Sequence, residues 1–177
     1  MEKFEIMNNH HEEKEEEEEA GIKYGDLLDQ ARKYIEEKSY KLAEFYVSLA
    51  MLEPKVDIFN KIKSIGILTF VRHNLKDAQI IDYLIFKIKK YLAENDVKNF
   101  EFSVVFCIIR VLYRGALVKL NDMELLISIC LLKQALNLFE EGNINNEINS
   151  KETINNLFRE AIDKYKQEVT IFIYLKQ

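Results

Sequence analysis

The stretch from Leu27 to Pro54 reads LLDQARKYIEEKSYKLAEFYVSLAMLEP. Its apolar residues recur at helical spacing on both sides of Lys38-Ser39, which predicts two short amphipathic helices joined by a tight turn. The inner stripes are expected to consist of Leu27, Ala31 and Tyr34 from the first helix and Tyr40, Ala43, Tyr46, Val47 and Ala50 from the second. The alanines allow the two backbones to approach closely, and the tyrosines fill the space beside them. The stretch therefore predicts a helical hairpin that ends at Pro54.

This order of large, small, aromatic, aromatic, small and small residues, followed by Pro, resembles one tetratricopeptide repeat of about 34 residues. Pro54 stands one place earlier than the Pro of the family, and Lys38 or Ser39 occupies the turn where the family often has Gly. No further clear copy follows along the chain. The resemblance implies a helical protein that binds peptides or proteins on the concave face of its first hairpins. The residues expected to contact the partner there are Tyr34, Lys38, Tyr40 and Lys41.

Composition predicts the rest of the fold. The chain has 177 residues, of which 48% are hydrophobic, but only five Gly and one Pro. One compact domain with long helices is expected, and an all-β or doubly wound α/β fold is not. The prediction is an all-α fold of six to seven helices, a helical bundle with partial tetratricopeptide-like, solenoid character.

Helical periodicity continues after the hairpin, over residues 55–72, 74–94, 99–120, 121–141 and 150–165. We expect Asn74 to cap the second of these helices, Asn121 with Glu124 to begin the fourth, and Ser150 to begin the last. Gly142 is well placed to end the fourth. The final run, Val169 to Leu175, is rich in β-branched and aromatic residues, so it could complete the last helix or form an edge strand for a partner chain.

The helix predicted over residues 99–120 is apolar nearly all round, which is typical of a central helix. Gly115 beside Ala116 suggests a close helix crossing. Arg110 and Arg114 stand one turn apart on its narrow polar stripe. They either form buried ion pairs, for which the candidate carboxylates are Glu101, Asp122 and Glu124, or line a groove that meets a partner's carboxylate or phosphate.

The net charge of −5 is unevenly distributed. Residues 1–20 carry nine Glu against two Lys, a net charge of −7, so the remaining residues carry +2. We predict a disordered acidic tail over residues 1–20 and a single α-helical domain over residues 21–177. Residues 55–98 carry nine basic and five acidic side chains, and Lys87, Lys89 and Lys90 cluster near a helix end. They either complement the helix dipole or contact phosphates, although few exposed aromatic side chains are expected beside them to stack on bases.

No pattern indicates catalysis, a metal site or a cofactor. His10 and His11 belong to the acidic tail, Arg72-His73 point in different directions on a helix, and no phosphate-binding glycine motif is present.

Cys107 and Cys130 lie alone in apolar helices and are interpreted as buried thiols. The N-terminus has no secretory pattern, and the longest apolar run contains two arginines, so we expect a cytoplasmic protein with no membrane span.

These observations favour a non-catalytic adaptor or accessory subunit that mediates protein–protein interactions within a larger complex. The alternative is an accessory subunit of a nucleic-acid machine, such as a DNA replication or transcription complex. Its contacts would come from Lys87, Lys89, Lys90, Arg110 and Arg114, and its acidic tail would compete with phosphate for them.

Overall fold

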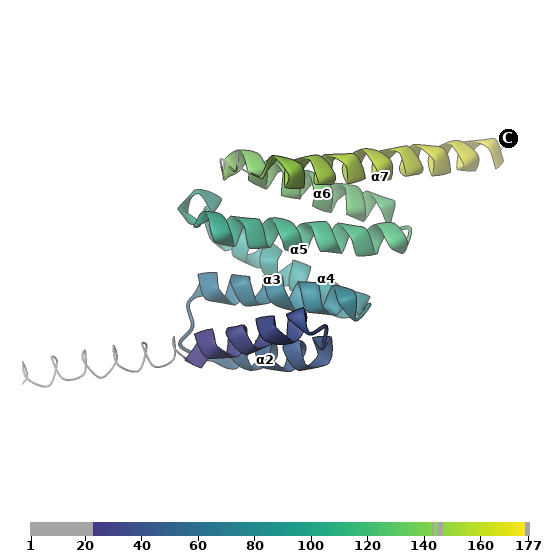
Figure 1. Cartoon of the computed structure of the whole chain (residues 1–177). Helices are drawn as coiled ribbons and strands as arrows, with labels where there is room; N and C mark the ends of the chain where they lie inside the picture. Colours follow the sequence, from purple (N-terminus) through teal and green to yellow (C-terminus); the bar gives the residue numbers. More distant parts are fainter. Residues whose placement is uncertain (1–22, 143, 145–146, 176–177) are drawn as a thin grey trace, which may run out of the picture. The chain divides into compact units, whose positions relative to one another are not determined.

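The computed structural model describes residues 23–142, 144 and 147–175, so the predicted acidic tail lies outside the described residues (Figure 1). Within these ranges the chain forms seven α-helices, one short 3₁₀ helix and no strand, which confirms the all-α prediction. The chain divides after Leu75 into two compact units, called here the N-terminal and C-terminal units. The single domain predicted for residues 21–177 stays a prediction.

The N-terminal unit contains a helix over residues 23–36, α2 (Tyr40–Leu52) and α3 (Ile58–Asn74). Ala31, Ala43 and Ala50 are completely buried, as predicted for the inner stripes, and Tyr34 of the first helix stacks on Tyr46 of α2 at 5.3 Å. One member of the inner stripe of the first helix was predicted wrongly, because Leu28 is buried whereas Leu27 is only half-buried.

Two polar contacts join the start of the first helix to the rest of this unit. The Tyr24 hydroxyl lies 2.8 Å from that of Ser64 in α3, and Lys23 pairs with Glu53 at 2.7 Å just after α2. The helix predicted from residue 55 begins instead at Ile58, because the Asp57 side chain accepts a hydrogen bond from the backbone N–H of Asn60 at 2.9 Å.

Left-handed residues end three of the helices. Lys38, Lys76 and Met123 have φ angles of 58°, 58° and 61°, and each is followed by one residue before the next helix begins. At Lys38 the turn is closed by the N–H of Ser39, which donates to the carbonyl of Tyr34 at 2.8 Å. A left-handed residue after a helix is usually Gly, because Gly carries no Cβ that would meet the backbone in this conformation.

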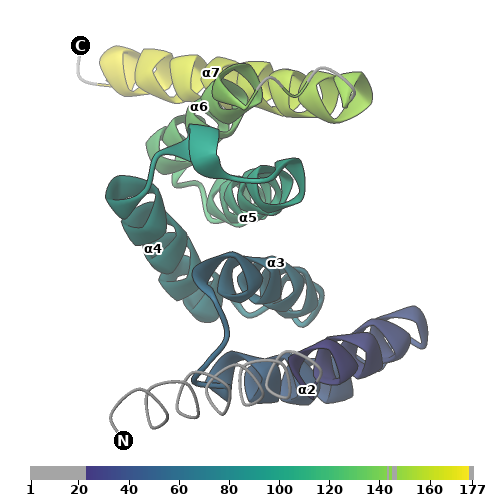
Figure 2. The ribbon, with the colours of Figure 1, turned by 90° about the vertical axis from the view of Figure 1, so that its left-hand side faces the viewer.

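The C-terminal unit contains α4 (Ala78–Glu94), η1 (Val97–Asn99), α5 (Phe102–Asn121), α6 (Leu125–Glu141) and α7 (Ile148–Leu175). α5 packs on α4 and on α6, and α6 lies between α5 and α7 (Figure 2). Half of α5 is buried, as expected of a central helix. The run Val169–Leu175 belongs to α7, so the strand alternative was wrong.

Small residues let α5 approach its neighbours closely. A Cβ atom added to Gly115 would overlap Ile85 of α4 and lie 3.5 Å from the Leu131 side chain of α6. The Ser128 hydroxyl of α6 donates to the carbonyl of Ala116 at 2.9 Å. The close crossing predicted at Gly115 and Ala116 is confirmed.

Several predicted helix ends were wrong. Asn74 is the last residue of α3, and the cap of α4 is Asp77, which accepts from the N–H of Ile80 at 3.3 Å. Asn121 ends α5 instead of beginning α6, and Ser150 lies inside α7. Gly142 does follow the last residue of α6, as predicted.

Candidate interaction surfaces

α2 carries a second apolar stripe, on the side opposite its buried alanines. Leu42, Phe45 and Leu52 expose 48%, 56% and 76% of their surface, and half-buried Leu49 lies between the last two. The spacing of three, four and three residues places all four on one helix face. We call these four residues the α2 stripe. A contiguous apolar face exposed to water is typical of an interaction site.

Aromatic contacts hold the centre of the α2 stripe in place. The Phe45 ring meets Tyr46 edge-on at 5.5 Å, and Tyr46 stacks on Tyr34 of the first helix at 5.3 Å. Repulsion from Tyr46 raises the pKa of Tyr34 above its ordinary value of 10.0. Phe45 is therefore presented by a connected aromatic group instead of by a freely rotating side chain.

Four residues of this chain were expected from the sequence to contact a partner, and three of them lie on or near the α2 stripe. Lys41 is exposed at the start of α2, Lys38 is exposed in the turn before it, and Tyr34 supports Phe45 through Tyr46. Tyr40 instead packs edge-on against Phe70 of α3 at 6.3 Å and is half-buried. The α2 stripe itself was missed, because only one inner stripe was assigned to this helix. The remaining leucines and Phe45 follow their own helical period, which is the signal that could have identified them.

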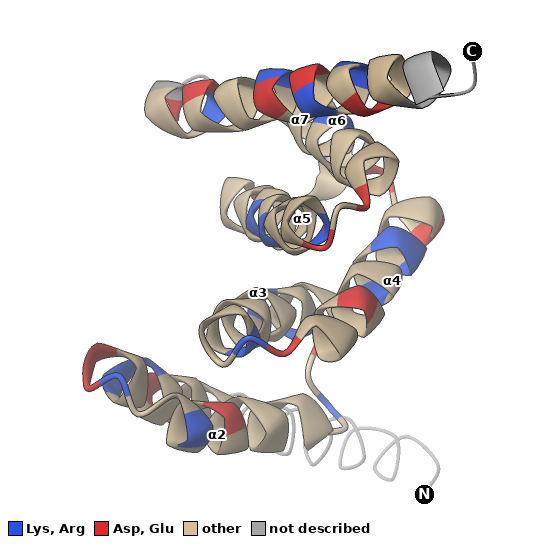
Figure 3. Cartoon of the chain, turned by 90° about the vertical axis from the view of Figure 1, so that its right-hand side faces the viewer, with Lys and Arg blue, Asp and Glu red and all other residues tan. Residues whose placement is uncertain are grey.

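α4 exposes aromatic rings among its lysines, contrary to the expectation of few such rings. Tyr83 and Phe86 expose 55% and 66% of their surface, and Lys89 and Lys90 are exposed as well. The ammonium of Lys87 lies 5.0 Å from the centre of the Tyr83 ring, and that of Lys90 lies 3.8 Å from Glu94. Figure 3 shows the basic segments of α4. The predicted lysine cluster thus surrounds exposed aromatic surface.

The two arginines of α5 differ from each other. Arg110 is exposed, and its guanidinium lies 4.3 Å from the ring centre of Phe106, which in turn stacks on Phe102. Because Arg110 is exposed, the interpretation that it forms a buried ion pair was wrong. Burial, and then repulsion from Arg110, lowers the pKa of Arg114 from its ordinary value to about 10.

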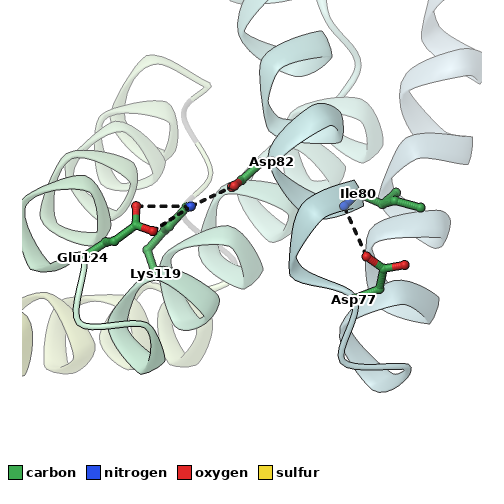
Figure 4. A network of polar contacts seen from close by, with 5 residues as sticks. All are labelled: Asp77, Ile80, Asp82, Lys119 and Glu124. Carbon is green, nitrogen blue, oxygen red and sulfur yellow. Dashed lines mark hydrogen bonds and ion pairs between the residues drawn. The ribbon is translucent and has the colours of Figure 1, made fainter.

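A buried lysine that the sequence did not single out links three elements of the C-terminal unit (Figure 4). The ammonium of Lys119 in α5 lies 2.8 Å from Asp82 of α4 and 3.2 Å from Glu124, the residue before α6. The hydrogen bond to Asp82 raises the pKa of Lys119 above 10.5. Glu124, which was a candidate partner for the arginines, contacts Lys119. The network therefore joins α4 and α5 to the start of α6.

The remaining candidate chemical groups are dispersed. Arg72 pairs with Glu44 of α2, and His73 beside it is half-buried. Cys107 is half-buried and Cys130 is exposed, so the interpretation of both as buried thiols was wrong. No three His, Cys, Asp or Glu side chains of the described ranges are grouped as ligands of a metal ion would be. None of the described helices is sufficiently long and apolar to cross a membrane.

No family model, curated protein or solved structure matches this chain. The resemblance to tetratricopeptide repeats therefore stays a prediction.

Proposed function

We propose that this protein is a non-catalytic helical adaptor, or accessory subunit, that binds a partner protein within a larger complex. The observation that carries the proposal is the α2 stripe, in which Leu42, Phe45 and Leu52 are each about half exposed or more. An aromatic side chain at the centre of an apolar patch is a common anchor of binding energy between proteins, and charged residues are depleted around it. The α2 stripe has this composition, with no charged residue among its four members.

The geometry of the α2 stripe favours a helical partner. Side chains at this spacing form a narrow ridge, which complements the apolar face of an amphipathic helix. Lys38 and Lys41 are exposed at the N-terminal end of α2, so acidic residues of the partner would lie at that end. The partner we propose is an amphipathic helix with apolar residues three or four apart and carboxylates at one end.

The test is affinity capture of the tagged full-length chain from its own cells, after nuclease treatment, followed by mass spectrometry. The wild type is expected to retain a defined set of proteins that Phe45→Ser and Leu52→Ser each lose. A loss of about 2 kcal/mol at a central anchor weakens binding about thirtyfold, enough to remove a micromolar partner during washing.

Leu126→Ser is the matched control. Leu126 of α6 is exposed to the same extent as Phe45, at 56%, but lies outside the α2 stripe. This variant should retain the captured proteins. If Phe45→Ser and Leu52→Ser retain them as well, the α2 stripe is not the binding surface and the proposal is wrong.

A further inference from the structure

One face of α4 combines rings and cations in a way that the α2 stripe does not. Tyr83, Phe86 and Lys90 are spaced three and four residues apart, so they follow one another along the exposed side of the helix. Lys87 and Lys89 flank this row. The buried side of the same helix is formed by Ile81, Leu84, Ile85 and Ile88. We call the five exposed or flanking residues the basic–aromatic face: Tyr83, Phe86, Lys87, Lys89 and Lys90.

The acidic residues of α4 do not cancel this charge. Asp82 lies 2.8 Å from the ammonium of Lys119, which it shares with Glu124, so its charge is partly offset by a cation from another helix. Glu94 lies at the end of the helix and meets Lys90 at the long distance of 3.8 Å, with both side chains more than half exposed. Such a surface pair is weak and easily exchanged for another anion.

The composition of this face indicates the class of its ligand. Lysine is depleted at the centres of protein–protein interfaces, whereas here lysines surround the aromatic centre on both sides. Flat rings that can stack on bases, with ammonium groups beside them for phosphates, are the features of surfaces that bind single strands. A duplex keeps its bases stacked inside, so it could use the lysines but not the rings.

We propose that the basic–aromatic face of α4 binds single-stranded RNA or DNA, with unpaired bases stacked on Phe86 and Tyr83 and phosphates beside the three lysines. This inference does not depend on the adaptor function, because it concerns another helix in another unit.

The test is a fluorescence anisotropy titration of the full-length chain with labelled oligouridine and oligothymidine of about 12 nucleotides, over a series of salt concentrations. Binding is expected at low salt and should weaken as salt rises. Phe86→Ser and Tyr83→Ser should each weaken binding by about tenfold. The logarithm of the association constant should fall linearly with the logarithm of the salt concentration. Replacing Lys87, Lys89 and Lys90 by Gln should make this slope shallower by about 0.7 for each phosphate that the protein no longer neutralises.

Matched controls come from the N-terminal unit. Phe45→Ser and Lys41→Gln remove an exposed ring and an exposed cation outside the face, and both should leave binding unchanged. A duplex of the same length should bind more weakly than either single strand.

Three results would overturn the proposal. The first is no binding at low salt, either by the natural chain or by a variant with Gln at the seven glutamates of residues 12–19, which removes competition from that acidic run. The second is binding that the ring and lysine variants leave unchanged. The third is binding that depends on the lysines but not on Phe86 or Tyr83, which would show a general polyanion contact without stacked bases.

Discussion

Lys119→Glu is expected to lower the free energy of unfolding of the C-terminal unit by about 3 kcal/mol or more. The side chain of Lys119 is buried between Asp82 and Glu124, so the substitution would place three carboxylates together. The new carboxylate would lose its access to water and gain no cation. Urea unfolding followed by circular dichroism measures the loss, and hydrogen exchange over α4, α5 and α6 locates it.

Lys119→Met separates the effect of charge from that of shape. Methionine fills a similar volume without a charge, and the two carboxylates left behind are about half exposed. We therefore expect the free energy of unfolding to fall by about 1 kcal/mol or less. If Lys119→Glu is no worse than Lys119→Met, the ion pairs do not stabilise the unit.

Alkaline pH gives an independent measure of the same network. The pKa of Lys119 is raised above 10.5, chiefly by its hydrogen bond to Asp82, so above pH 10.5 the folded state binds more protons than the unfolded state. The contribution of Lys119 is therefore complete at neutral pH and is lost as pH rises through the raised value. The stability of the wild type should fall more steeply above pH 10.5 than that of Lys119→Met.

Gly115→Val should destabilise the same unit by about 2–3 kcal/mol. The added Cβ would overlap the end of the Ile85 side chain, which would have to change its conformation inside the core, and it would already touch the Leu131 side chain of α6 at 3.5 Å. Calorimetric or urea melts measure the change. Gly25→Ala is the matched control, because a Cβ at Gly25 meets no atom within 4 Å and should instead stabilise its helix by up to about 1 kcal/mol.

A double-mutant cycle tests the steric overlap itself. Ile85→Val removes the terminal methyl that the new Cβ would meet, so Gly115→Val combined with Ile85→Val should lose less stability than the sum of the two single changes. Strict additivity would show that Gly115 is not required by the crossing with α4.

The all-α fold could be predicted because apolar periodicity and the scarcity of Gly and Pro both depend on local sequence. The burial of Ala43 and Ala50, and the central position of α5, followed from the same patterns. Helix ends were harder, because a cap is defined by backbone angles as well as by residue type. Asn74 and Asp77 are both suitable cap residues, and only the left-handed turn at Lys76 decides between them.

Surface features were predicted least well. The lysine cluster of α4 was identified, but the exposure of Tyr83 and Phe86 was not, since an aromatic residue on a helix is more often buried. The α2 stripe was hidden for a related reason. α2 has apolar residues on two faces, and periodicity alone does not tell which face is covered by the rest of the chain. Lys119 was overlooked because its carboxylate partners, Asp82 and Glu124, come from other elements.

The most direct test of the central claim, that the α2 stripe binds a partner protein, is photo-crosslinking in living cells. Benzoylphenylalanine would replace Phe45 in the full-length chain, with the same residue at Leu126 as control. We predict a protein crosslinked at position 45 and not at 126, whose crosslinked peptide is an amphipathic helix with acidic residues at one end. The claim would be contradicted if position 45 crosslinked to no protein, or only to the proteins found at position 126.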